Sequence, residues 1–399
     1  MESTKSTKST NRFTKRPRMN HDLLGIGLTG KTLTDLERRI LRENTPYAVV
    51  LFGRNIGSVA QFRELVAEVK SLAPGQPPLF MIDQEGGRVD RLRNILPGLP
   101  SVEAFGEGET PAELSEWFGK VTGMALRYFD IEINLAPVVD IRGPVAPKGL
   151  ERRTFGSDPE TVVELAGAFM RGMHGAGVSS CLKHWPGIGE GSGDPHYGET
   201  VIDASFEQLQ ERELVPFVRL GNEAGAVMIS HGIYPLVEDN PNLPATLSRR
   251  LTTDLLRDTV KFNGLAVSDD MEMHAVSDLG SYEEITERAL MAGNDVILFC
   301  SHIERVPDLQ QFLTDRVSGN LKVRTRFDEA VVRCDAFRAH CDRLRAASTP
   351  PATWDDVVDE TARFVEAFER TRPHREVVVP ESDRRKGSRN PRTGREEWT

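Results

Sequence analysis

Short apolar runs rich in valine, isoleucine and leucine recur along the chain, and longer amphipathic stretches separate them. The runs are continuously apolar rather than alternating, which is typical of parallel strands that are buried on both faces of a sheet. We therefore predict strands at Leu23–Leu28, Tyr47–Phe52, Leu79–Ile82, Ile133–Ala136, Val178–Lys183, Ala226–Ser230, Leu265–Ser268 and Asp295–Phe299.

The stretches between these runs carry helix start signals and helical periodicity. Asp158 is a candidate N-cap with Pro159 at the first helical position, and apolar residues then recur at i, i+3, i+4 and i+7. Ser205 and Gln208 form a capping-box pattern at the start of another helix, which we expect to be kinked at Pro216. This alternation favours an α/β fold, a single (β/α)8 TIM-like barrel with extra C-terminal helices, over a doubly wound sheet, although periodicity alone leaves both open.

The two ends of the chain depart from this pattern. Residues 1–20 are basic and rich in serine and threonine, and residues 374–399 include the charged run Arg384–Lys386. We expect both to be disordered tails, because they have too few apolar groups to offset the entropy of ordering. The barrel is expected over residues 21–350, and one further helix over residues 351–373.

The composition is that of a globular protein, with 39% hydrophobic and 28% charged residues in a chain of 399. A formal net charge of −10 argues against a general binder of nucleic acid or of anionic membranes. No apolar run reaches the length of about 18 residues that a spanning helix needs, and no apolar signal core follows the basic start, so we expect a cytoplasmic protein. The scattered cysteines form no CxxC pair, which argues against a disulfide scaffold or a cysteine zinc site. They are Cys181, Cys300, Cys334 and Cys341.

Charged side chains gather where the predicted strands end. Asp83 follows the third strand, the fifth strand ends at Lys183–His184, His231 follows the sixth, and Asp269–Asp270 follow the seventh. An aspartate in such a place is often only the cap of the next helix, and a lone histidine such as His231 is more often a hydrogen-bonded structural residue than a catalyst. Because the carboxyl ends of barrel strands meet at one face, however, these groups together predict a site at the mouth of the barrel.

A glycine-rich loop follows the fifth strand. It begins with Lys183–His184, passes through several glycines and ends with Asp194 and His196. In an extended segment, residues two apart lie on the same side, so Asp194 could orient His196 and raise its basicity. The alternative is a surface loop whose polar residues are incidental.

This loop resembles the K-H-F-P-G-x-G-x4-D-x-H signature of glycoside hydrolase family 3, in its bacterial β-N-acetylglucosaminidase (β-hexosaminidase) branch. The chain departs from the family pattern at Ile188 and Pro195. Other segments resemble the family's motifs in the same order, over about residues 22–300. They are Ile82–Arg91 (IDQEGGRVxR), Asn134–Asp140 (NxAPVxD), Arg153–Pro159 (RSFGxDP) and Ser268–Met273 ([ST]DxLxM).

The resemblance implies an exo-β-N-acetylglucosaminidase that acts on muropeptides in peptidoglycan recycling by a retaining double displacement. It implies that Asp269 is the nucleophile, that His196 is the general acid/base, and that Asp194 activates His196; Asp270 is then a helix cap or a supporting neighbour. We expect a small carbohydrate or muropeptide as the only partner of a monomer, with no metal, cofactor, nucleic acid or membrane. The residues that match the family's sugar-binding positions are Asp83, Arg91, Arg153, Lys183 and His184.

Four alternatives stay open. A β-N-acetylglucosaminide phosphorylase or a β-glucosidase would use the same fold. Phosphorolysis would compete with hydrolysis because a histidine acid/base carries less negative charge than a carboxylate and so repels phosphate less. A metal-dependent hydrolase could use His184, Asp194, His196 and Asp269, although no HxH or HExxH pair is present. A sugar-binding barrel without catalysis is the last alternative.

Overall fold

The computed structural model describes residues 22–106, 112–144, 147, 149–191 and 200–371. The two expected tails, together with Asp194 and His196, lie outside these residues.

All eight predicted strands are present, and they form a closed parallel barrel in which each strand pairs with its neighbour in the sequence and β1 pairs with β8. The prediction of a (β/α)8 barrel is therefore confirmed, and the doubly wound alternative is wrong. The strands are β1 (Leu24–Gly27), β2 (Ala48–Leu51), β3 (Leu79–Ile82), β4 (Ile133–Asn134), β5 (Ser179–Trp185), β6 (Gly225–Ile229), β7 (Leu265–Asp270) and β8 (Val296–Phe299).

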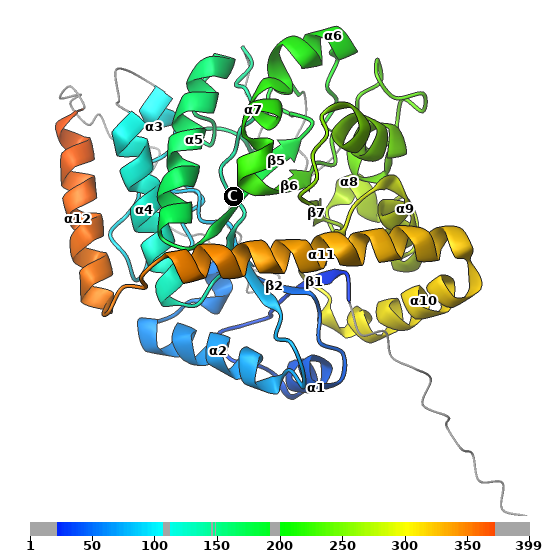
Figure 1. Cartoon of the computed structure of the whole chain (residues 1–399), viewed down its shortest axis with the longest axis horizontal. Helices are drawn as coiled ribbons and strands as arrows, with labels where there is room; N and C mark the ends of the chain where they lie inside the picture. The colour runs from blue at the N-terminus through cyan, green and yellow to red at the C-terminus, as the bar shows by residue number, and fades with distance from the viewer. Residues whose placement is uncertain (1–21, 107–111, 145–146, 148, 192–199, 372–399) are drawn as a thin grey trace, which may run out of the picture.

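Helices cover the outside of the barrel (Figure 1). They are α1 (Asp35–Glu43), α2 (Val59–Leu72), α3 (Glu103–Gly106), α4 (Ala112–Tyr128), α5 (Pro159–Gly175), α6 (Phe206–Gln208), α7 (Val215–Ala224), α8 (His274–Ser277), α9 (Tyr282–Ala292), α10 (Val306–Gly319), α11 (Leu321–Ala347) and α12 (Trp354–Arg370). None of the helices in the described part of the chain is long and apolar enough to span a membrane.

The predicted helix starts are confirmed, but one predicted helix is divided. Asp158 caps α5 by accepting a hydrogen bond from the Thr161 amide, and Ser205 opens α6 with a capping box. The expected kink at Pro216 is misplaced, because a π-helical segment, Leu209–Glu213, interrupts the helix before the proline. Pro216 then lies in the first turn of α7, where its missing N–H costs no hydrogen bond.

Helix α11 crosses the amino-terminal end of the barrel (Figure 1). Buried Asp295, which directly precedes β8, accepts hydrogen bonds from Arg326 of α11 and from Arg257, each at 2.6 Å. The Tyr47 hydroxyl, just before β2, donates to the Cys334 carbonyl of α11 at 3.0 Å. Since α11 occupies this end, the carboxyl ends of the strands remain as the face that can hold a site.

Helix α12, which lies within the range expected for a C-terminal helix, packs along α4 (Figure 1). Its Phe364 ring stacks on Phe118 of α4, with 5.5 Å between ring centroids. At its amino-terminal end, Trp354 contacts Tyr128 and Phe129, with centroids 5.2 and 4.9 Å away.

Candidate active site

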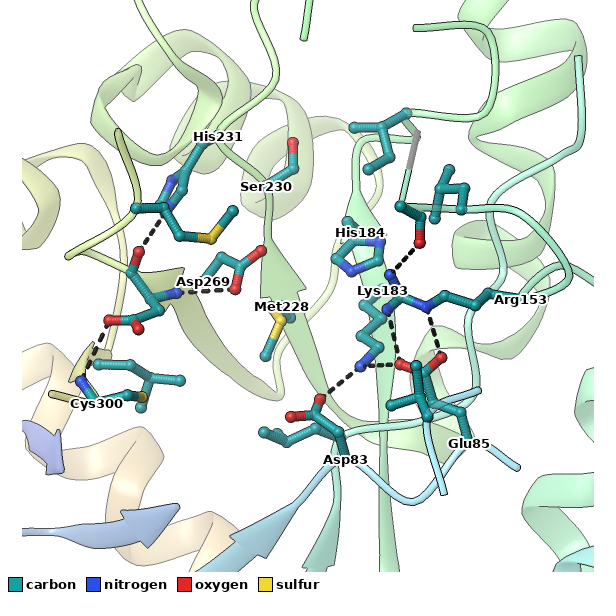
Figure 2. A pocket seen from close by; sticks show the side chains of 18 of the residues that line it. Asp83, Glu85, Arg153, Lys183, His184, Met228, Ser230, His231, Asp269 and Cys300 are labelled. Carbon is teal, nitrogen blue, oxygen red and sulfur yellow. Dashed lines mark hydrogen bonds and ion pairs between the residues drawn. The ribbon is translucent and has the colours of Figure 1, made fainter. Parts of the chain in front are cut away.

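A cavity of about 560 Å³ lies at the carboxyl ends of the barrel strands. Its walls bring together all the predicted site residues that the structure describes (Figure 2). They are Asp83, Arg91, Arg153, Lys183, His184 and Asp269. Because Asp194 and His196 are outside the described residues, their predicted dyad is not placed.

Lys183 is an almost fully buried cation whose charge is offset by two carboxylates. It comes from β5, which runs two residues past its predicted end, and its Nζ lies 2.7 Å from Asp83 Oδ1 and 2.6 Å from Glu85 Oε1. Burial would lower the pKa of Lys183, but these carboxylates raise it above its ordinary value. The lysine is therefore a fixed ammonium group at the cavity wall.

Arg153 forms a bidentate pair with Glu85, a residue to which the sequence analysis gave no role (Figure 2). The guanidinium Nε and Nη2 donate to the two Glu85 oxygens at 2.7 and 2.8 Å, and Nη1 donates to the Gly149 carbonyl at 2.7 Å. Burial alone would raise the pKa of Glu85, but Arg153 and Lys183 hold it far below its usual range. With its plane fixed, Arg153 keeps the rest of its N–H groups for a ligand.

His184 is oriented by Asp140, the second residue that sequence reasoning missed. The His184 Nδ1 donates to Asp140 Oδ2 at 2.7 Å, and the Ile188 amide donates to Asp140 Oδ1 at 2.8 Å. Asp140 thus holds both the imidazole and the first turn of the loop after β5. With Nδ1 committed, Nε2 is the ring nitrogen that can meet a ligand in the cavity.

The two adjacent aspartates at the end of β7 have different surroundings. Burial would raise the pKa of Asp269, but His231, His184 and the Asp270 amide lower it below its ordinary value, so Asp269 is ionised at neutral pH. Burial, with a smaller contribution from Glu272, raises the pKa of Asp270 to about 7.

Asp270 supports the loop between β7 and β8 rather than capping a helix. Its Oδ1 accepts the Glu272 and Cys300 amides, each at 3.2 Å, whereas the N-cap of α8 is Met273. The interpretation of Asp270 as a helix cap is therefore wrong, and that of a supporting neighbour agrees with these contacts.

His231 is a hydrogen-bonded structural residue, in line with the more cautious interpretation of its sequence position. Its Nε2 donates to the Asp270 carbonyl at 2.9 Å, and its Nδ1 lies 2.6 Å from Thr246 Oγ1. The imidazole therefore links Thr246 to the end of β7, on which Asp269 stands.

Within the described residues, no group of three or more histidine, cysteine, aspartate or glutamate side chains could hold a metal ion. The metal-site alternative named above includes Asp194 and His196, which lie outside those residues.

Glu213 packs beneath the loop after β5. It belongs to the π-helical segment, and a Cβ added at Gly187, whose φ is +120°, would lie 2.7 Å from the Glu213 Cβ. Burial, with the nearby Asp140 carboxylate, raises the pKa of Glu213 from 4.5 to about 8. At neutral pH Glu213 is therefore protonated in the folded protein, whereas it has released this proton in the unfolded chain.

We expect the Glu213→Gln variant to lose less stability than the parent protein as the pH rises. The proton on Glu213 stabilises the folded state below pH 4.5, and this contribution is lost progressively up to about pH 8. One such group changes the free energy of unfolding by at most about 1.4 kcal/mol per pH unit. Urea titrations of both proteins at pH 5.5, 7 and 8.5 measure the difference.

Glu211→Gln, an exposed neighbour, is the control, and its stability should follow that of the parent at each pH. Parallel stability profiles for the parent and Glu213→Gln would contradict the assignment.

Comparisons with known proteins agree with the barrel fold. The family described as "Glycosyl hydrolase family 3 N terminal domain" matches residues 23–336. A beta-hexosaminidase of Pseudomonas aeruginosa is 38% identical over 282 residues, which are 70% of this chain and 82% of that protein. A glycoside hydrolase family 3 beta-N-acetylglucosaminidase from Paenibacillus sp. superimposes with a TM-score of 0.75 and 31% identity, over 86% of this chain and 67% of the other. NagZ from Neisseria gonorrhoeae, solved with N-trifluoroacetyl-D-glucosamine, gives a TM-score of 0.68 and 26% identity, over 84% of this chain and 100% of the other.

Proposed function

Since this chain belongs to glycosyl hydrolase family 3, we propose that the cavity at the carboxyl ends of the strands is its active site. The protein is a glycoside hydrolase of the β-N-acetylhexosaminidase type, which removes terminal non-reducing β-linked N-acetylglucosamine. The observation that best supports the site is the ionised Asp269 on one wall of the cavity, opposite the fixed group of Lys183, Arg153 and Glu85 on the other (Figure 2).

The proposed reaction is a retaining double displacement. The Asp269 carboxylate attacks the anomeric carbon and forms a glycosyl ester, while His196, polarised by Asp194, gives its proton to the departing glycosidic oxygen. Water then gives a proton back to His196 and attacks the anomeric carbon, which releases the sugar and restores the Asp269 carboxylate. The lowered pKa of Asp269 suits the first role, because only the ionised form is a nucleophile.

The sugar hydroxyls are proposed to bind the charged groups opposite Asp269. Lys183 and Arg153 are held by carboxylates before any ligand arrives, and His184 is held by Asp140. Because these donors are already oriented, binding a hydroxyl group costs little side-chain entropy. Asp83 and Arg91, whose Oδ2 and Nη2 are 3.7 Å apart, complete the proposed set.

The biological setting is proposed from the resemblance to the family branch. We propose that the protein is a cytoplasmic monomer that releases N-acetylglucosamine from muropeptides during peptidoglycan recycling. Phosphorolysis in place of hydrolysis is the second candidate, and a family 3 β-glucosidase is the third.

Paired aryl substrates test the proposed activity. We expect the aryl β-N-acetylglucosaminide to be cleaved at least tenfold faster, by kcat/KM, than the matching β-glucoside, a difference of about 1.4 kcal/mol or more in transition-state binding. Proton NMR of the first product should show the β-anomer, as retention requires. Equal or reversed rates would indicate a glucosidase, and release of N-acetylglucosamine 1-phosphate in phosphate buffer would indicate a phosphorylase.

A further inference from the structure

We propose that Phe368 of α12, acting through Phe105 of α3, is a positioning residue for the Arg153–Glu85 pair and thereby for binding of the terminal sugar. This inference rests on the proposed function of that pair. Helix α12 (Trp354–Arg370) follows the family match, which ends at residue 336. Phe368 therefore belongs to the part of the chain that the family match does not include.

Residues 99–106, here called the brace segment, link the two loops that carry the partners of the ion pair. On the Glu85 side, the Gly87 amide donates to the Leu99 carbonyl at 3.0 Å. A Cβ added at Gly86, next to Glu85, would lie 2.4 Å from the Pro100 carbonyl oxygen, so the two backbones are in close contact.

The brace segment is equally close to the loop that carries Arg153. The Ser101 hydroxyl donates to the carbonyl of Arg152. A Cβ added at Gly106 would overlap the carbonyl oxygen of Phe155, at 1.5 Å, which only glycine permits. A displacement of the brace segment would therefore move both Glu85 and Arg153, or separate them.

Helix α12 supports the brace segment from outside. The rings of Phe368 and Phe105 have centroids 4.5 Å apart, and Phe105 contacts Phe155 at 6.4 Å. Both Phe105 and Phe368 are almost fully buried, with 1% and 3% of their surface exposed. Loss of the Phe368 ring would leave space behind Phe105 into which the brace segment can relax. Because a hydrogen bond weakens steeply when its geometry departs from the ideal, a small relaxation is enough to weaken binding of the sugar by Arg153.

The variant Phe368→Ala tests this proposal in the full-length protein with an aryl β-N-acetylglucosaminide. We expect KM to rise on the order of tenfold with kcat nearly unchanged, because Arg153 contacts the sugar in both the ground state and the transition state. The same change is expected with good and poor leaving groups, since proton transfer is not affected. Phe368→Leu keeps most of the side-chain volume and should restore KM to within about twofold of the parent value.

Trp354→Ala is the matched control, because it also removes an aromatic ring of α12, but at the end that contacts Tyr128 and Phe129. It should lower Tm as Phe368→Ala does and leave KM unchanged. If Phe368→Ala does not fold, Phe368→Val takes its place with the same expectation. An unchanged KM in the Phe368 variant, or an equal rise in Trp354→Ala, would overturn the proposal. Failure of the parent protein to cleave the substrate would instead overturn the proposed function.

Discussion

Replacement of Asp269 by alanine is expected to lower kcat by about 10⁴-fold or more, because no covalent intermediate can form without the carboxylate. The loss should be the same for every leaving group, and a substrate with an acidic phenol should give no burst of phenol before the steady state. Pre-steady-state absorbance with a nitrophenyl β-N-acetylglucosaminide measures both quantities.

Two variants serve as controls for Asp269→Ala. Asp270→Asn should keep most of the activity, because the Asp270 carboxylate accepts backbone amides at the β7–β8 loop. Asp194→Ala should lower kcat by about 10²–10⁴-fold, the usual contribution of general acid–base catalysis. This variant should still give a phenol burst, because an acidic phenol leaves without a proton. A burst from Asp269→Ala, together with an inactive Asp270 variant, would show that the other aspartate is the nucleophile. Identical losses of Asp194→Ala with good and poor leaving groups would contradict its role in proton transfer.

Lys183→Met is expected to lower the free energy of unfolding by about 3–5 kcal/mol, the usual cost of removing one partner from a buried ion pair. Methionine fills much of the same space, so the main change is that Asp83 and Glu85 lose the ammonium group 2.7 and 2.6 Å away. The pKa of Glu85 should rise, since Lys183 helps to lower it. Urea denaturation followed by circular dichroism measures the loss, and the variant should also bind the sugar poorly.

Arg88→Met is the matched control for Lys183→Met. Arg88 also forms an ion pair near the cavity, with Glu151 at 2.9 Å, but the two side chains are 55% and 45% exposed. Exposed pairs contribute about 1 kcal/mol or less, so this variant should be nearly as stable as the parent. Similar losses for the two variants would contradict the assignment of the Lys183 cluster as a buried ionic network.

The barrel could be predicted because its strands carry a local signal. Strands buried on both faces must be apolar at every position, and Leu79–Ile82 shows this in four consecutive residues. The π-helical segment Leu209–Glu213 could not be predicted, since it follows a regular capping box and differs from an α-helix only in its hydrogen bonding. Pro216 predicted a break in the helix, but the break lies a few residues before the proline.

The site was predictable to the extent that its residues stand at strand ends or in recognisable motifs. Glu85 and Asp140 were missed, although both lie in quoted motifs, because their roles depend on partners far away in the sequence. Glu85 pairs with Arg153, 68 residues later, and Asp140 pairs with His184, 44 residues later. The available signal was that both carboxylates stand in motifs that resemble those of the family, and only the three-dimensional structure shows which side chain each one meets.

The ionic groups of the cavity also determine how its charge changes during the proposed reaction. The charged side chains that line the cavity include the cations of Lys183, Arg153, Arg91 and Arg88 and the carboxyl groups of Asp83, Glu85, Asp269 and Asp270. When the ionised Asp269 becomes an ester, one negative charge is lost and the cavity becomes more positive than in the free enzyme. The glycosyl-enzyme therefore attracts anions more strongly than the free enzyme does. Transfer of the glycosyl group to an anionic acceptor such as phosphate should consequently slow as ionic strength rises, whereas hydrolysis by neutral water should not.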